Sequence, residues 1–226
     1  MQPRLPREQR KPASPSRRTL PKRYHHGELP RALLNAALHI VRTEGTHGLT
    51  LRAVARRAGV SQAAPYRHFA NKEAILAAVA EEGFRSLIAL IHGAVDAYGD
   101  NPLARLRTVG LSYIDFATTH PTHFRIMFGR EMADRSSRAV RQLATETFNT
   151  VIEAIADCQR AGLARTEEPA ADLALTAWAS VHGLAVLLAD GVLDRPVAEV
   201  AGIVTRDLFL GLGRRSDEEP STRTTA

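Results

Sequence analysis

One stretch of 23 residues, from Thr50 to Lys72, constrains the fold of this chain more than any other. Its sequence is TLRAVARRAGVSQAAPYRHFANK. The first apolar residues recur at the spacing of one helical face, namely Leu51, Val54, Ala55 and Ala58. Thr50 can cap the start of this helix, and Gly59 supplies the left-handed residue that turns the chain at its end. The first half of the stretch therefore predicts a short amphipathic helix closed by a sharp turn.

The second half predicts another short helix, which Ser61 caps and which crosses the first helix closely at Ala55. Pro65 falls in the first turn of that helix, where a missing N–H is least costly. Only Val60 and Phe69 are expected to face the interior. The other side chains offer donors for base edges and phosphates, or small surfaces that fit against a groove wall.

We therefore interpret residues 50–69 as a helix-turn-helix that contacts DNA. The residues expected to bind DNA are Thr50, Arg52, Ser61, Gln62, Ala63, Ala64, Tyr66, Arg67, His68 and Lys72. An amphipathic helix, a glycine turn and a second helix also occur in compact helical proteins that bind no nucleic acid. The distribution of charge separates these two interpretations.

The positive charge of the chain is confined to its first third. Residues 1–72 contain 15 Lys or Arg and 3 Asp or Glu, a net charge of +12. The other 154 residues contain 15 basic and 21 acidic residues, a net charge of −6, within a total of +6. A polyanion is attracted to the first part and repelled by the second. A solvated tail accounts for the arginines before residue 20 but not for those between Arg52 and Lys72.

The remainder of the chain predicts helices throughout, because it is rich in Ala and Leu, has 5% aromatic residues and shows no strand pattern. Helices are expected at 30–44, 71–98, 103–119, 136–161, 170–189 and 197–212, with a short apolar piece at 124–128. We predict an all-α protein with an N-terminal three-helix DNA-binding domain and a helical ligand-binding and dimerisation domain. The expected divisions are a disordered basic arm (1–23), the DNA-binding domain (24–84), the C-terminal domain (85–213) and a disordered tail (214–226).

Several other classes of protein are disfavoured. The single cysteine, Cys158, allows neither a disulfide nor a cysteine-based zinc site within one chain and fits a reducing cytoplasm. The basic N-terminus is followed by no apolar stretch, so we expect no secretory signal. The uncharged run between Asp172 and Asp190 is 17 residues long and contains polar residues, which favours a buried or interfacial helix over a membrane span. His120 and His123 are separated by a proline, so no metal site is expected.

Common signatures of enzymes are also missing. The chain has no Gly-rich phosphate loop, no Gly-x-Ser-x-Gly elbow, no His-Glu-x-x-His and no paired cysteines. We therefore expect no catalytic residue, no cofactor and no enzymatic activity.

Residues 24–84 resemble the DNA-binding domain of TetR-family transcriptional regulators. The match is nearly position by position over the segment GLTLRAVARRAGVSQAAPYRHFANKEAIL. The resemblance implies that Tyr66 and Lys72 hold phosphates, whereas Arg52 and Gln62 to Ala64 contact bases or the groove wall. Pro65 stands where the family often has a larger apolar residue. YHHG, at 24–27, resembles the lead-in of one branch of the family.

The C-terminal half resembles a subtype of the same family with a Trp-His-Gly signature. Trp178, His182 and Gly183 in WASVHG fit that signature, and HPTHFRIMF at 120–128 fits the same subtype. Large apolar side chains here are expected to line an effector pocket: Phe84, Phe116, Phe124, Met127, Phe128, Trp178 and His182. The alternative is that they form plain core, with Trp178 and His182 packing one helix against another.

The resemblance implies a homodimer whose last two helices form a four-helix bundle and whose partner is double-stranded DNA with a pseudo-palindromic operator. The expected function is a repressor that a small-molecule effector releases from its operator, acting in the cytoplasm on the bacterial nucleoid, with no membrane partner. Two alternatives are a constitutive DNA-binding regulator without an effector and a helical dimerisation module without a DNA function.

Overall fold

The computed structural model describes residues 28–129 and 137–212, and this part of the chain is helical with no strand. The all-helical fold class is thereby confirmed. Its α-helices are α1 (Glu28–Glu44), α2 (Leu51–Ala58), α3 (Lys72–Val95), α4 (Pro102–Thr119), α5 (Pro121–Phe128), α7 (Arg138–Arg160), α8 (Ala170–Ala189) and α9 (Val197–Leu212). Short 3-10 turns lie between them: η1 (Thr46–Gly48), η2 (Pro65–Arg67) and η3 (Asp96–Tyr98). The predicted basic arm, the YHHG segment and the predicted tail lie outside the described residues.

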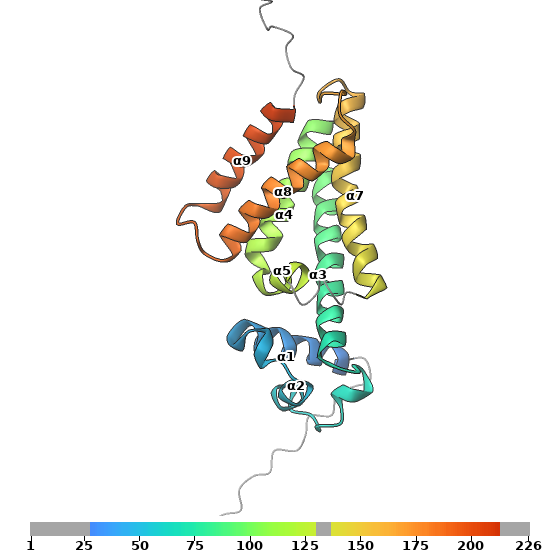
Figure 1. Cartoon of the computed structure of the whole chain (residues 1–226), viewed down its shortest axis with the longest axis vertical. Helices are drawn as coiled ribbons and strands as arrows, with labels where there is room; N and C mark the ends of the chain where they lie inside the picture. Colours follow the sequence, from blue (N-terminus) through green and yellow to red (C-terminus); the bar gives the residue numbers. More distant parts are fainter. Residues whose placement is uncertain (1–27, 130–136, 213–226) are drawn as a thin grey trace, which may run out of the picture.

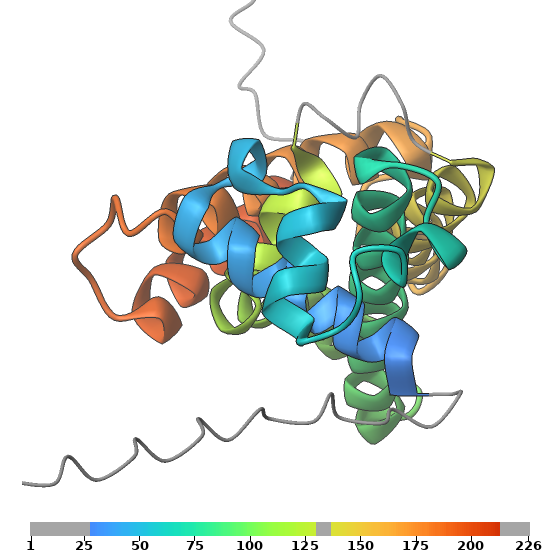
Figure 2. The ribbon, with the colours of Figure 1, turned by 90° about the horizontal axis from the view of Figure 1, so that it is seen from below.

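The helices form two layers along the long axis of the molecule, and α3 connects them (Figure 1). At the lower end α1 and α2 pack against each other, and α1 also packs against α3. At the upper end α4 and α7 pack against the rest of α3 and against each other, α8 packs on α4 and α7, and α9 lies outermost against α8 and α4. Seen from below, α1, α2 and η2 form the near end of the molecule (Figure 2).

Helices α2, α3, α4 and α7 begin where a short polar side chain accepts from a free backbone N–H group. Thr50 Oγ1 accepts a hydrogen bond from the Ala53 N–H at 3.0 Å, and Asn71 Oδ1 accepts one from the Ala74 N–H at 2.8 Å. Gly59 ends α2 with φ 70° and ψ 32°, a left-handed conformation that suits glycine. The predicted caps at Thr50 and Asn71 and the predicted turn at Gly59 are confirmed.

Apart from shifts of one or two residues at helix ends, two helical segments after residue 70 differ from the prediction. The helix expected over 71–98 ends as an α-helix at Val95 and continues as η3. The piece predicted only as a short apolar segment is a full helix, α5, because Pro121 fits the first helical position directly after α4 ends. The expected helices at 170–189 and 197–212 agree with α8 and α9 to the residue.

One large cluster of buried apolar side chains runs from α1 through α3 to α9. Ile75, Val79 and Leu87, all on α3, are fully buried within it. The predicted domain boundary after residue 84 therefore falls inside a continuous buried helix, and α3 is shared by both ends of the molecule. A smaller cluster at the upper end contains Ile155 and Leu173.

Among the described helices, α8 alone has the length and mean hydropathy, 1.5, of a membrane span. It packs against α4, α7 and α9, and the core helix of a globular protein has the same length and composition.

Helix α5 lies across α3 at Gly83, and the fit there is close. A methyl group on Gly83 would come within 2.5 Å of the Met127 sulfur and 3.4 Å of His123 Cβ. Met127 is itself 4% exposed. Only a residue without a side chain lets the two helices approach this closely.

We expect Gly83→Ala to lower the free energy of unfolding by about 1 kcal/mol, because overpacking of about 1–3 kcal/mol outweighs a helix-propensity gain of just under 1 kcal/mol. Gly110→Ala is the matched control. Its new methyl would meet Thr205 and Val181 at 3.7 and 3.8 Å, an ordinary contact, so this variant should gain about 0.5–1 kcal/mol. Urea unfolding of both variants measures the difference, and equal effects would contradict the close contact.

Candidate nucleic-acid interface and apolar cavity

The lower end of the molecule presents a basic surface on α2. This helix buries Leu51, Val54 and Ala55 and leaves Arg52, Arg56 and Arg57 exposed. Arg56 and Arg57 were not among the residues predicted to bind DNA, although they lie on the exposed side of the same helix. The pattern of charged and apolar residues along this helix was sufficient to identify both arginines as surface residues.

The second helix of the helix-turn-helix, predicted to be very short, is shorter than expected and is not α-helical. Residues 62–64 form a turn, and η2 follows as a single 3-10 turn. The N–H of Ala64 donates to the Ser61 carbonyl at 3.0 Å, because Pro65, the residue that would donate there in an α-helix, has no N–H. The Ser61 side chain caps no helix in the described part of the chain; its backbone carbonyl is the group that is used.

Pro65 anchors this segment to the core. Its ring is buried, as is Phe69, whose N–H donates to the Pro65 carbonyl at 2.9 Å. Val60 is half-buried. The sequence predicted that Phe69 and Val60 face inward. It did not predict the burial of Pro65, because the prediction for this residue concerned only its missing backbone N–H.

The predicted DNA-binding residues gather on the surface of this end. Exposed side chains are those of Thr50, Arg52, Ser61, Gln62, Ala63, Tyr66, Arg67 and His68; Ala64 and Lys72 are half-buried. Tyr66 leaves 55% of its surface exposed, although it is a large aromatic residue. Lys72 is the first residue of α3, where free N–H groups and the helix dipole also favour an anion.

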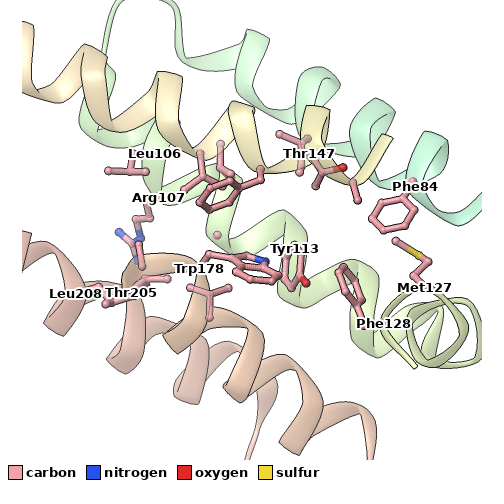
Figure 3. A pocket seen from close by; sticks show the side chains of 18 of the residues that line it. Phe84, Leu106, Arg107, Tyr113, Met127, Phe128, Thr147, Trp178, Thr205 and Leu208 are labelled. Atoms are coloured by element: carbon pink, nitrogen blue, oxygen red, sulfur yellow. The ribbon is translucent and has the colours of Figure 1, made fainter. Parts of the chain in front are cut away.

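The upper end encloses an apolar cavity of about 370 Å³ between α3, α4, α5, α7, α8 and α9 (Figure 3). This volume lies within the range of about 300–1,000 Å³ that is usual for small-molecule sites. Of the residues predicted to line a pocket, Phe84, Met127, Phe128 and Trp178 do so.

Three other residues predicted for the pocket lie behind its wall. Phe116 and Phe124 are buried in the core at 1% and 2% exposure, and neither they nor His182 line the cavity. Three aromatic residues that the sequence did not single out line the cavity instead, namely Tyr113, Phe148 and Phe209. Helical spacing cannot identify them, because the cavity depends on how several helices meet.

Tyr113 connects the cavity wall to His182. Its hydroxyl lies 2.8 Å from His182 Nδ1 and also accepts a hydrogen bond from Trp178. The Tyr113 hydroxyl can donate its hydrogen to Nδ1 when the neutral imidazole carries its own proton on Nε2. Burial raises the pKa of Tyr113 well above its usual value and lowers the pKa of His182. Both groups are therefore held neutral.

The other histidines of the described residues and Cys158 belong to residue types that can bind a metal ion or react. Residues 28–129 and 137–212 contain no group of three His, Cys, Asp or Glu side chains that could hold a metal ion. His123 lies 3.7 Å from Glu82 across the contact between α5 and α3, and burial lowers its pKa. Cys158 is buried, and burial raises its thiol pKa, which disfavours the reactive thiolate.

The lowered pKa of His182 predicts how stability depends on pH. As the pH falls below about 6.5, the unfolded state takes up a proton before the folded state does. The contribution of neutral His182 to the free energy of unfolding is therefore complete above about pH 6.5. It is lost as the pH falls toward the pKa of His182 in the folded state. We expect the urea midpoint to drop between pH 7.5 and pH 5.5, and His182→Asn to reduce that drop. His92→Asn removes an exposed histidine and should leave it unchanged; equal drops in all three proteins would contradict the assignment.

Comparison with known proteins matches both ends of the chain to models of one family. Residues 33–79 match the model of bacterial regulatory proteins of the tetR family, and residues 106–208 match that of the tetracyclin repressor-like C-terminal domain. Over 52 residues the chain is 48% identical to the class A tetracycline repressor from transposon 1721 of Escherichia coli, covering 23% of this chain and 24% of the repressor. The chain thus aligns with about a quarter of the length of the tetracycline repressors that it matches.

Solved structures match over most of the chain. A Rhodococcus sp. RHA1 protein of unknown function has a TM-score of 0.75 and 35% identity, over 85% of this chain and 100% of that protein. AibR, solved in complex with isovaleryl coenzyme A and operator DNA, has a TM-score of 0.66 and 20% identity, over 80% of this chain and 98% of AibR. The likeness to AibR concerns the fold.

Proposed function

From the premise that this chain belongs to the TetR family of bacterial transcriptional regulators, we propose that it is a homodimeric repressor that a small-molecule effector releases from its operator. The observation that carries the proposal is that α3 joins a basic surface with exposed polar side chains to an apolar cavity. The protein would act in the cytoplasm on the nucleoid, where its DNA lies.

Two recognition segments, one from each protomer, would enter successive major grooves about 34–36 Å apart. Tyr66 and Lys72 would bind phosphates, since one has a phenol hydroxyl and the other a cation at a helix N-terminus. Gln62 and Arg52 would contact base edges, because an amide and a guanidinium can bind a base with two hydrogen bonds. The compact 3-10 turn places few side chains against the groove, so we expect α2 to contribute Arg56 as well.

The dimer proposal rests on an exposed small and apolar stripe along α8. Leu175, Ala179, Gly183 and Leu187 repeat every four residues and are all exposed. Leu175 and Leu187 leave 55% and 41% of their surface in solvent. A methyl group on Gly183 would meet nothing within 4 Å. Such a stripe lets a second α8 approach closely and bury the leucines.

The cavity favours an effector-controlled repressor over the constitutive alternative. A solid core would have left no space among Phe84, Phe128 and Trp178, whereas these side chains line a cavity. We also propose that the chain belongs to the Trp-His-Gly subtype. In support, Trp178 and His182 have ring centroids 5.3 Å apart, and Trp178 bonds the same hydroxyl as His182.

The effector would act through α5. Phe128 and Met127 of this helix line the cavity, and α5 packs against α3 and also contacts α1. Arg125 joins the same helix to the end of α8, donating to Asp190 Oδ1 at 3.0 Å and to the Ala189 carbonyl at 2.9 Å. A ligand that displaces α5 would therefore change the position of the DNA-binding helices.

Lys72→Ala should weaken binding to every duplex and reduce the slope of log K against log salt by about 1, because one phosphate contact is lost. Gln62→Ala should instead change the preference among duplexes selected by the wild-type protein from a random pool. Arg160→Ala, which removes a positive charge at the far end of α7, is the control and should change neither. Fluorescence anisotropy at several salt concentrations measures all three. If Lys72→Ala behaves like the control, the proposed DNA surface is wrong.

Leu187→Glu should break the dimer, because a carboxylate would be buried in the stripe of α8. Light scattering should give twice the chain mass of 24.7 kDa for the wild type and one chain mass for the variant. Leu90→Glu places the same charge on an exposed leucine of α3 and should remain a dimer. A monomeric wild type at micromolar concentration would remove the two-fold operator model.

A further inference from the structure

The cavity wall is apolar except for a few polar groups, and most of these have partners inside the protein. The Thr147 hydroxyl donates to the Leu143 carbonyl at 2.9 Å, and the Thr205 hydroxyl donates to the Ala201 carbonyl at 2.7 Å. The Tyr113 hydroxyl is shared between His182 and Trp178. These groups offer little to a ligand, since a neutral polar ligand gains most from groups whose hydrogen-bonding capacity is unused.

Arg107 differs from every other polar group on the wall. Within residues 28–129 and 137–212 its guanidinium has neither a hydrogen bond nor an ion pair. Its neighbour Arg105, on the same helix but not on the cavity wall, lies 3.5 Å from Asp157. Arg141 also lines the cavity and already takes part in an interaction of its own.

The position of Arg107 gives the cavity two unlike ends. The side chain lies at one end, near Leu106, Thr205 and Leu208, whereas Phe84, Met127 and Phe128 lie at the other (Figure 3). A guanidinium has five N–H donors and no acceptor and stays charged at physiological pH. It therefore attracts an anion and repels a cation.

We propose that the effector of this protein is an apolar molecule with a single anionic group, a carboxylate or a group of similar charge, which Arg107 binds. This inference rests on the proposed effector function. The apolar body fills the cavity toward Phe84 and Phe128, and the anionic group stays at the Arg107 end. A carboxylate matches the planar guanidinium with two parallel hydrogen bonds. Because the volume of about 370 Å³ is near the lower end for ligand sites, the body is small.

Arg107 is exposed to solvent, and this is consistent with an anionic group bound at the open side of the cavity. An exposed ion pair between two mobile side chains is weak, because solvent screens it and both side chains lose freedom. A ligand held by its apolar body brings its charge to a fixed place beside an apolar wall, where the attraction is screened less. The anionic group also remains near water before binding, which lowers its desolvation cost.

The test uses three compounds with one ten-carbon chain: decanoate, decan-1-ol and decylamine. Their binding to the full-length protein is measured by displacement of the neutral fluorophore N-phenyl-1-naphthylamine and by titration calorimetry. We expect the wild type to bind decanoate at least about tenfold more tightly than decan-1-ol, and decylamine most weakly. Arg107→Gln should weaken decanoate about tenfold, equivalent to about 1.4 kcal/mol, and leave decan-1-ol unchanged.

Arg105→Gln is the matched control, because it removes the same charge from α4 outside the cavity wall. It should bind decanoate as tightly as the wild type does. The affinity of Arg107→Lys for decanoate should lie between those of the wild type and Arg107→Gln. Equal binding of the acid and the alcohol, equal loss in both glutamine variants, or no calorimetric binding of decanoate would each overturn the proposal.

The same samples separate this inference from the proposed function. DNA binding is measured on the duplex selected by the wild-type protein, with and without each compound. If decanoate binds through Arg107 but leaves the protein on DNA, the ligand class holds and the effector function fails. If decan-1-ol releases the DNA and decanoate does not, the effector function holds and the anionic class is wrong.

Discussion

The contact between α5 and α3 at Gly83 is the constraint on which the rest of the structure depends. Met127 occupies the space that any side chain at position 83 would take, so the two helices cannot shift independently. Met127 also faces the cavity, and α5 contacts α1. One short helix therefore touches the apolar cavity, the helix shared by both ends of the molecule, and α1 of the DNA-binding end. This arrangement gives a physical route between the two sites that the proposed function needs.

The DNA-binding end illustrates how one residue changes local structure without changing the surface. Pro65 removes a backbone donor, so the predicted recognition helix becomes a turn followed by a 3-10 turn. The same proline is buried beside Phe69 and holds the segment in place. Gln62 and Tyr66 remain exposed as the sequence predicted. The side chains available to DNA were thus predictable, whereas the backbone that presents them was not.

The cavity illustrates the opposite case, in which local structure was predicted and the site was not. The large apolar residues outside the segment 124–128 were correctly assigned to helices, yet Phe116 and Phe124 became core and Tyr113 and Phe148 became wall. Every one of them satisfies the same helical periodicity. Their roles differ only through the neighbouring helix that each one meets. Arg107 is a further example, because only the tertiary structure shows that it lies on the wall of a cavity.

The sequence by itself determined the helices, most of their ends and the basic surface, because these depend on groups within about four positions along the chain. Thr50, Gly59 and Asn71 each act on the helix or turn in which they lie. The distribution of charged residues along the chain can be read directly from the sequence. Only the tertiary structure decided the cavity, the Gly83 contact and the pairing of Tyr113 with His182, which are 69 positions apart. Such contacts follow from the packing angles and distances of whole helices, and these result from all the side chains between them at once.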